Sequence, residues 1–188
     1  MKKLYMFDCF GVLIGELAPI WFSKRYPPEE AIQLKDFYFN SADSGEKDMK
    51  TLISDLSTGL NIEREVIVKE FEEIFTINYE LFDYLKVLKK RGNDIILVSN
   101  APEGLVESIF SSFDLYKYFD NVFVSWKYKM IKPNLEYYKL CLSINNGTYD
   151  KVFMIDDNQN NLNNLESIGV TPIHFVNNEN LIKELEEA

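Results

Sequence analysis

Five short apolar runs are spread along the chain, and each is typical of a strand that is buried on both faces. They show no clear alternation of polar and apolar residues, as expected for strands inside a parallel sheet. The segments between them carry apolar residues at helical spacing, for example Leu81, Leu85 and Leu88. Strands that alternate with helices predict parallel pairing with right-handed crossovers. The expected strands are residues 4–7, 95–98, 122–125, 152–155 and 173–176.

Two further helices are expected between these strands. Pro102 suits the first turn of one of them. Their expected apolar faces consist of Leu105, Ile109 and Phe113 and of Leu162, Leu165 and Ile168.

Residues 16–80 break the alternation of strands and helices. They contain no good strand, but helical patterns surround Leu52 and Leu56 and, further on, Ile67 and Phe71. We therefore expect a small helical cap, inserted after the first strand and its loop. The expected fold class is α/β, a Rossmann-like parallel sheet with helices on both faces. Its core domain comprises residues 1–15 and 81–188, and its cap domain residues 16–80.

Composition limits the possible partners and surroundings of the protein. The formal net charge of −10 argues against nucleic acid, whose phosphates need clustered Lys and Arg. No apolar run approaches the ~20 residues of a membrane span, and Met1 and two lysines lead directly into a strand, so neither a membrane span nor a signal peptide is expected. Two cysteines are too few for a disulfide framework. A cytoplasmic monomer or homodimer is expected.

Acidic side chains stand where two of the expected strands end. Asp8 follows the first apolar run, and Asp156 and Asp157 follow the fourth. Taken singly, each could simply cap a turn. Ligands of open α/β sheets bind beyond the carboxyl ends of the strands, where three neighbouring carboxylates would repel one another. A hard divalent cation such as Mg²⁺ resolves this repulsion, so the sequence predicts a metal site there.

Two other short motifs are expected at the same edge. Ser99 and Asn100 follow the second apolar run and, if a helix begins next, offer a hydroxyl and backbone N–H groups to an anion. Lys132 stands before Pro133, which favours an extended or turn conformation for it, and its ammonium group could neutralise a carboxylate or a phosphate.

These motifs, in this order and spacing, closely resemble those of the haloacid dehalogenase-like hydrolases over nearly the whole chain. The inserted helices resemble a C1-type cap, and the segment 45–60 is similar to the subgroup that contains glucose-1-phosphatase-like enzymes and the phosphatase domain of soluble epoxide hydrolase. The resemblance implies that Asp8 is the nucleophile and that Lys132 stabilises an aspartyl-phosphate on it. It also implies that Ser99 and Asn100 bind phosphate together with Lys132. The ligands of Mg²⁺ would be Asp8, the main-chain carbonyl of Phe10 and Asp157, with Asp156 bound directly or through water, and Asn161 would hydrogen-bond the residues around Asp156 and Asp157.

Phe10 departs from the pattern of the phosphatases in this family. They usually carry a second aspartate there, as the general acid for the leaving group, so hydrolysis of an alkyl ester should be slower by about 10²–10⁴-fold. The cap acids Asp43 and Glu46 are possible surrogates, whereas His174 is expected to be a core or edge side chain. Cys9 is expected to be a small buried residue.

The expected function is hydrolysis of a small phosphorylated metabolite with Mg²⁺, through an aspartyl-phosphate on Asp8. Two alternatives stay open. An aromatic residue at position 10 is also similar to the L-2-haloacid dehalogenases, which carry tyrosine there and need no metal. The third possibility is a protein that keeps the fold for binding or regulation with little turnover.

Overall fold

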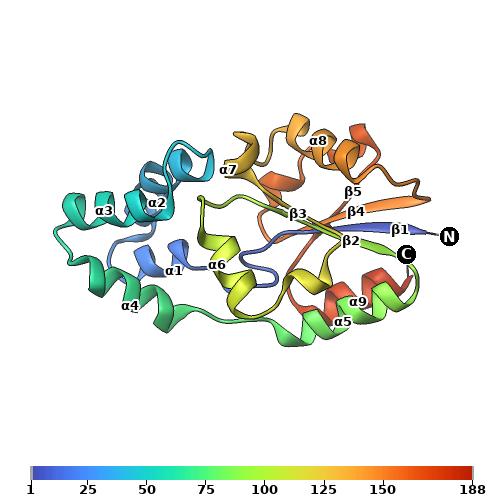
Figure 1. Ribbon diagram of the computed structural model, residues 1–188, viewed down its shortest axis with the longest axis horizontal. Coiled ribbons are helices and arrows are strands. Elements are labelled where there is room, and N and C mark those ends of the chain that lie inside the picture. Colours follow the sequence, from blue (N-terminus) through green and yellow to red (C-terminus); the bar gives the residue numbers. More distant parts are fainter. Residues whose placement is uncertain (1, 188) are drawn as a thin grey trace.

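A five-stranded parallel sheet forms the centre of the structure, a computed structural model that describes residues 2–187 (Figure 1). The strand order is β3-β2-β1-β4-β5, so β1 is the central strand. The chain adds β2 and β3 on one side of β1 and then crosses back to add β4 and β5 on the other side. The α/β fold predicted from the sequence is confirmed. The strands are β1 Lys3–Phe7, β2 Asp94–Ser99, β3 Asn121–Val124, β4 Lys151–Asp156 and β5 Thr171–His174.

Helices cover both faces of this sheet. Figure 1 shows α5 and α9 on one side and α8 on the other, with α1–α4 beyond the end at which the strands finish. None of the helices in the described residues combines the length and apolar character needed to cross a lipid bilayer. The helices are α1 Ala18–Ser23, α2 Pro28–Asp43, α3 Met49–Leu60, α4 Arg64–Ile74, α5 Tyr79–Lys90, α6 Leu105–Ser112, α7 Ser125–Tyr128, α8 Leu135–Asn145 and α9 Asn178–Glu187, with 3-10 turns η1 Tyr116–Tyr118, η2 Gln159–Leu162 and η3 Leu165–Ile168.

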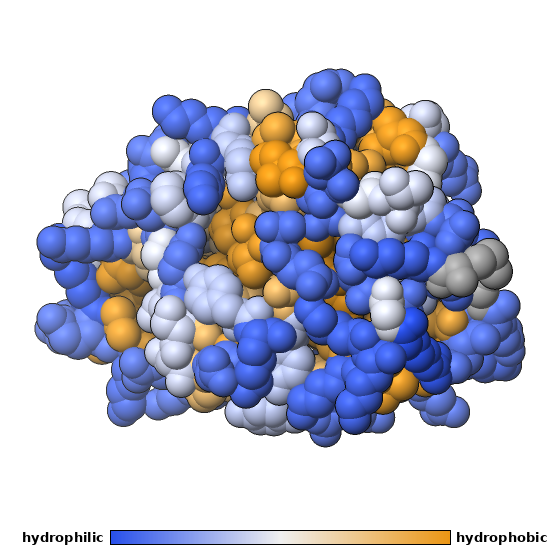
Figure 2. All heavy atoms as spheres, turned by 45° about the vertical axis from the view of Figure 1, so that its right-hand side comes forward, coloured by the Kyte–Doolittle hydropathy of each residue, from blue (hydrophilic) through white to orange (hydrophobic). Residues whose placement is uncertain are grey.

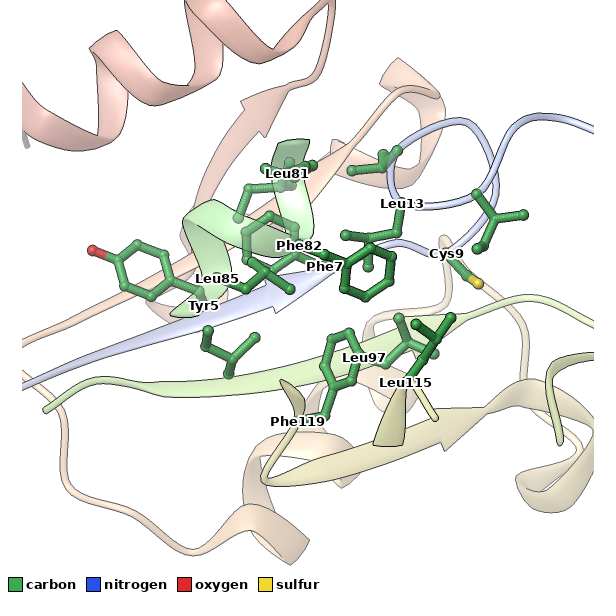
Figure 3. Packing of buried hydrophobic residues seen from close by; sticks show 14 of the residues in the cluster. Tyr5, Phe7, Cys9, Leu13, Leu81, Phe82, Leu85, Leu97, Leu115 and Phe119 are labelled. Atoms are coloured by element: carbon green, nitrogen blue, oxygen red, sulfur yellow. The ribbon is translucent and has the colours of Figure 1, made fainter. Parts of the chain in front are cut away.

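Alternate residues of each central strand enter two separate hydrophobic clusters. Tyr5 and Phe7 of β1 lie in one cluster with residues of α5 (Figure 3), α6 and α9, whereas Leu4 and Met6 lie in another with residues of α8, η2 and η3. Because both faces are covered, both sets of side chains are apolar, which explains why the sequence shows no alternation. Over most of one outer face, hydrophilic residues surround recessed hydrophobic ones (Figure 2).

Helices α1–α4, which we call the inserted helices, surround a third hydrophobic cluster. Trp21, Phe22, Leu52 and Leu56 are fully buried in it. The two chain segments that join these helices to the sheet pair with each other, since the N–H of Gly15 donates to the carbonyl of Thr76 at 3.0 Å. The inserted helices therefore form a packed layer beyond the carboxyl ends of the strands.

Several expected elements differ in their limits. The fifth strand covers Thr171–His174 rather than residues 173–176, and Ser125 begins α7 instead of ending β3. The helix expected around residues 162–168 consists of two 3-10 turns. In α6 the fully buried residues are Val106 and Phe110, because this helix packs with the face next to the expected one.

Candidate active site

The polar residues predicted at the strand ends meet at one edge of the sheet. Asp8 follows β1 directly, and its N–H donates to the carbonyl of Ile155 in β4 at 2.9 Å. Asp156 is the last residue of β4, and Asp157 follows it. Because β1 and β4 are neighbouring parallel strands in register, their carboxyl ends place these acids side by side.

The ammonium group of Lys132 lies between two of these carboxylates. Its Nζ is 2.7 Å from Oδ1 of Asp8 and 2.6 Å from Oδ2 of Asp156, and the residue is only 3% exposed. Asn100 holds the Lys132 backbone, because its side chain accepts from the Lys132 N–H at 2.8 Å and donates to the Lys132 carbonyl at 3.1 Å. The structure thus brings Asn100 and Lys132 together with the acids.

Asp156 is enclosed by hydrogen-bond donors and does not face the solvent. The Nδ2 group of Asn161 donates to both of its oxygens, at 3.0 and 3.1 Å, and the N–H of Asn158 donates to Oδ1 at 2.9 Å. With Lys132 on Oδ2, this fully buried carboxylate is saturated. Its geometry suits the positioning of Lys132 better than direct metal ligation.

Asp8 and Asp157 complete an acidic cluster with Asp156. One carboxylate oxygen of each lies within 4.8 Å of the others. Among residues 2–187, Lys132 is the only cation that forms an ion pair with any of these acids, so with all three ionised the cluster would carry two negative charges in excess. The carboxylate of Asp157 lies over Gly11, where a Cβ atom would overlap it, and Gly11 has a φ of +82°. The donor set and its charge fit a divalent cation with oxygen ligands, such as Mg²⁺.

The main-chain carbonyl of Phe10 is one of the predicted metal ligands. The Gly11 N–H donates to the Ile14 carbonyl and the Ile14 N–H to the Cys9 carbonyl, and neither backbone group of Phe10 bonds any of residues 2–187. Within residues 2–187, the Phe10 carbonyl accepts no hydrogen bond. The residue lines the cleft described below, and its ring packs against two of the hydrophobic clusters. No acidic group is present at this position.

The charges of the cluster shift the pKa values of its members. Burial raises the pKa of Asp8 well above its usual range, and Asp156 raises it further, which together outweigh Lys132. Burial and then Asp156 also raise the pKa of Asp157. For Lys132, burial lowers the pKa, but the attraction of Asp156 and Asp8 is larger in sum, so the pKa is raised and the ammonium form is retained. Without a cation, the ionised forms of Asp8 and Asp157 are therefore disfavoured.

Ser99 lies next to the site, but its side chain is not exposed to the cleft. The residue is fully buried at the end of β2, and its hydroxyl group can hydrogen-bond the buried thiol of Cys9. Moreover, α6 begins only at Leu105, so the expected helix N-terminus directly after Ser99 is wrong. Pro102 likewise precedes the helix instead of standing in its first turn. A role for Ser99 in phosphate binding stays a prediction.

A cleft of about 930 Å³ separates the acidic cluster from the inserted helices. Asp8, Asp157 and Lys132 line its floor. Besides the exposed Asp36, two acids that are not proposed metal ligands also line it, namely Asp43 and Glu16. Burial raises the pKa of each of them to about 7. Glu16 was not predicted from the sequence, because it follows the first motif and belongs to no motif or periodic segment.

Two other predicted positions lie outside this cleft. Glu46 is exposed and lines a separate shallow depression on the inserted helices, so it is wrong as a surrogate acid in this arrangement. His174 lies on the edge strand β5, as expected, and its Nε2 is 2.9 Å from the Asp157 carbonyl oxygen.

Comparison with known proteins identifies the family. The sequence model of the haloacid dehalogenase-like hydrolases matches residues 2–169. The chain belongs to this family. No curated protein sequence matches it.

Solved structures from the same family share the fold. A predicted hydrolase from Porphyromonas gingivalis is 23% identical, with a TM-score of 0.76, and the match covers 100% of this chain and 97% of that one. A family enzyme from Bacteroides thetaiotaomicron, in complex with magnesium and inorganic phosphate, is 18% identical, with a TM-score of 0.73 and coverage of 93% and 94%. The L-2-haloacid dehalogenase of Xanthobacter autotrophicus is 16% identical, with a TM-score of 0.65 and coverage of 100% and 84%. At these identities the likeness shows the fold alone.

Proposed function

We propose that this hydrolase cleaves the phosphate monoester of a small metabolite with the help of Mg²⁺, and that the inserted helices are a cap over its active site. The observation that carries the proposal is the uncompensated negative charge of Asp8, Asp156 and Asp157, which face one lysine at the floor of a cleft. A cluster of this kind needs a cation before an anionic substrate can approach. The magnesium and phosphate complex of the related Bacteroides enzyme supports the same interpretation.

Asp8 is the proposed nucleophile. Its Oδ1 is held by Lys132 at 2.7 Å and by the N–H of Cys9 at 2.6 Å, whereas its Oδ2 receives no hydrogen bond from residues 2–187. Oδ2 is therefore the oxygen that can attack phosphorus, forming an aspartyl-phosphate that water then hydrolyses. Lys132 fixes the other oxygen and partly neutralises the negative charge of the phosphoryl group.

Asp8, Asp157 and the Phe10 carbonyl are the proposed ligands of Mg²⁺, with Asp156 behind them. When bound, Mg²⁺ neutralises the acids and stabilises negative charge on the phosphoryl group. Asp156 and Asn161 keep Lys132 in place through the buried hydrogen bonds described above. Asn100 holds the Lys132 backbone, and its side chain also lines the cleft, where it could donate to a phosphate oxygen.

Hydrolysis of 4-nitrophenyl phosphate in the presence of Mg²⁺ tests the proposal. We expect turnover that chelation of the metal removes and that Asp8→Asn abolishes, because the amide is not a nucleophile. Asp114→Asn, an exposed aspartate far along the chain on the connection after α6, is the matched control and should keep full activity. A lack of Mg²⁺-dependent turnover across a broad panel of phosphate esters would contradict the proposal.

Dehalogenation is the second candidate, because Phe10 supplies an aromatic ring two residues after Asp8 and the fold is shared with a haloacid dehalogenase. The Asp157 carboxylate and the charge excess beside it favour the phosphatase. Metal-independent release of chloride from L-2-chloropropionate, sensitive to Asp8→Asn, would instead select the dehalogenase.

A further inference from the structure

The proposed reaction needs a general acid for the leaving group, and no such acid stands at the expected position, residue 10. Cleavage of an alkyl phosphate releases an alkoxide, which has to be protonated, and the side chain of Phe10 carries no proton to give. Besides Asp8 and Asp157, the acids that line the cleft among residues 2–187 are Glu16, Asp36 and Asp43. Asp36 is exposed, and its carboxylate forms an ion pair with Lys35 at 3.2 Å.

Asp43 is fixed to the sheet side of the cleft although it belongs to an inserted helix. It is the last residue of α2, and its backbone carbonyl accepts a hydrogen bond from the Ser125 hydroxyl at 2.5 Å. The same hydroxyl accepts from the N–H of Ala101 at 3.0 Å. Ala101 follows Asn100, which holds Lys132, so this chain of bonds fixes the position of Asp43 relative to the reacting groups.

The surroundings of Asp43 keep its carboxyl group partly protonated at neutral pH. Burial raises its pKa to about 7, although Lys35 of its own helix and Lys132 from the sheet side lower it, and Asp36 raises it. These are the charged groups close enough to act on it.

Glu16 has a similar pKa for a different reason. After burial, the largest influence on Glu16 is the carboxylate of Asp157. A cation bound beside Asp157 would offset that influence and favour the ionised form of Glu16. The charges around Asp43 are mainly lysines, and none of the proposed metal ligands is among them.

We propose that Asp43 is the general acid of this active site and takes the place of the aspartate that is absent at Phe10. The inference rests on the function proposed above. As the bond between Asp8 Oδ2 and phosphorus forms, the bond between phosphorus and the ester oxygen breaks, and its electron pair goes to that oxygen. The carboxyl proton of Asp43 passes to the same oxygen, which leaves as the alcohol. The Asp43 carboxylate then accepts a proton from the water that releases phosphate from Asp8, which restores both residues.

The test compares phosphate esters whose leaving groups differ in basicity, with Asp43→Asn as the variant. For an alkyl ester such as glycerol phosphate, kcat should fall by about 10²-fold or more. For 2,4-dinitrophenyl phosphate, whose leaving group needs no proton, the loss should be at least about tenfold smaller. The wild-type rate on the alkyl ester should decrease as the pH rises through about 7, because the acid form of Asp43 is lost, and the variant should lack this decrease.

Three further variants make the assignment specific. Glu30→Gln removes an exposed carboxyl group of the same helix outside the cleft and should leave both rates unchanged. Asp43→Glu keeps an acid and should recover part of the alkyl-ester activity. Glu16→Gln should lower both rates to a similar extent, if at all. A selective loss of alkyl-ester activity in Glu16→Gln, or an equal loss on both esters in Asp43→Asn, would overturn the inference.

Infrared difference spectra of the metal-free protein supply a readout that does not depend on turnover. A carboxylic acid band that disappears between pH 6 and 8 should be present in the wild type and weaker in Asp43→Asn. An unchanged band would overturn the inference even if that variant were inactive. If the wild type failed to hydrolyse even 2,4-dinitrophenyl phosphate with Mg²⁺, the proposed function and this inference would both fall. Turnover without the selective loss would remove the inference alone.

Discussion

Lys132 and Asp156 form a buried ion pair whose remaining hydrogen bonds are all provided by neighbouring residues. Removing two charges from water is costly unless the other lone pairs and protons also find partners. Here Asn161 and the Asn158 backbone complete the shell of Asp156, and Asp8 supplies the second partner of Lys132. Among the described residues, no buried side-chain nitrogen or oxygen lacks a hydrogen bond. The position of the ammonium group therefore depends on Asp156, which does not line the cleft, and on the residues that hydrogen-bond it.

Asn161→Ala tests this dependence. The change removes both bonds from Nδ2 to the buried carboxylate, so the free energy of unfolding should decrease by about 1–3 kcal/mol. Asn163→Ala is the matched control, because this asparagine is exposed two residues further on, and its effect should stay within about 0.5 kcal/mol. Urea denaturation of both variants measures the difference. Equal effects of the two substitutions would show that the bonds to Asp156 contribute little to stability.

At the scale of elements, the sequence predicted the central strands well and several helices poorly. Strands β1, β2 and β4 are apolar runs because the sheet is covered on both faces, and this signal is strong. Helix α2 was not predicted because its apolar periodicity is weak. Two of its buried residues, Ala31 and Ala42, are small, while Ile32 and Phe37 are exposed.

The limits of β5 were hard to predict for another reason. It is an edge strand, where Pro172 is tolerated because its missing N–H need not face a neighbour. The exposed Val176 continues the apolar run beyond the end of the strand, so the strand was expected to extend to residue 176.

The loop after β1 offers a prediction at this scale. Gly11 and Gly92 both have a positive φ, of +82° and +84°, but a Cβ at Gly11 would overlap the Asp157 carboxylate, whereas a Cβ at Gly92 would meet nothing within 4 Å. Gly92→Ala should therefore cost only the backbone strain of about 1–2 kcal/mol. Gly11→Ala should cost more and should also weaken Mg²⁺ binding, because Asp157 has to move. Thermal unfolding and calorimetric titration with Mg²⁺ measure the two effects, and equal Mg²⁺ affinity in both variants would contradict the expected place of Asp157 in the metal site.

For the whole molecule, topology explains which part of the candidate site could be predicted. Asp8, Asp156 and Asp157 stand at the ends of parallel strands, which share one edge of the sheet whatever the details of packing. The direction of the buried Ser99 side chain could not be predicted in this way, because it depends on local packing at the end of β2 that no periodicity reveals. Glu16 and Asp43 line the same cleft only because the inserted helices pack as a layer against the carboxyl ends of the strands.

These two layers are joined at opposite margins of the cleft, and the joint at Ser125 offers the last prediction. One margin is the covalent connection, where Gly15 pairs with Thr76. At the other, the Ser125 hydroxyl bonds the Asp43 carbonyl, and the Met49 N–H donates to the Glu103 carbonyl at 3.1 Å. Ser125→Ala removes the acceptor of the buried Ala101 N–H and the donor to Asp43, so about 1–3 kcal/mol of stability should be lost.

The loss should be concentrated at this margin, because the covalent connection still holds the opposite one. Hydrogen exchange at the amides of Met49 and Ala101 should accelerate more in Ser125→Ala than exchange in the central strand β1. Ser167→Ala, whose exposed hydroxyl bonds the Asn164 carbonyl at 2.6 Å within a 3-10 turn, is the control and should leave those amides unchanged. Uniform acceleration over the whole chain would instead mean that the two layers open only when the entire protein unfolds, and that the hydroxyl stabilises the fold without controlling the cleft.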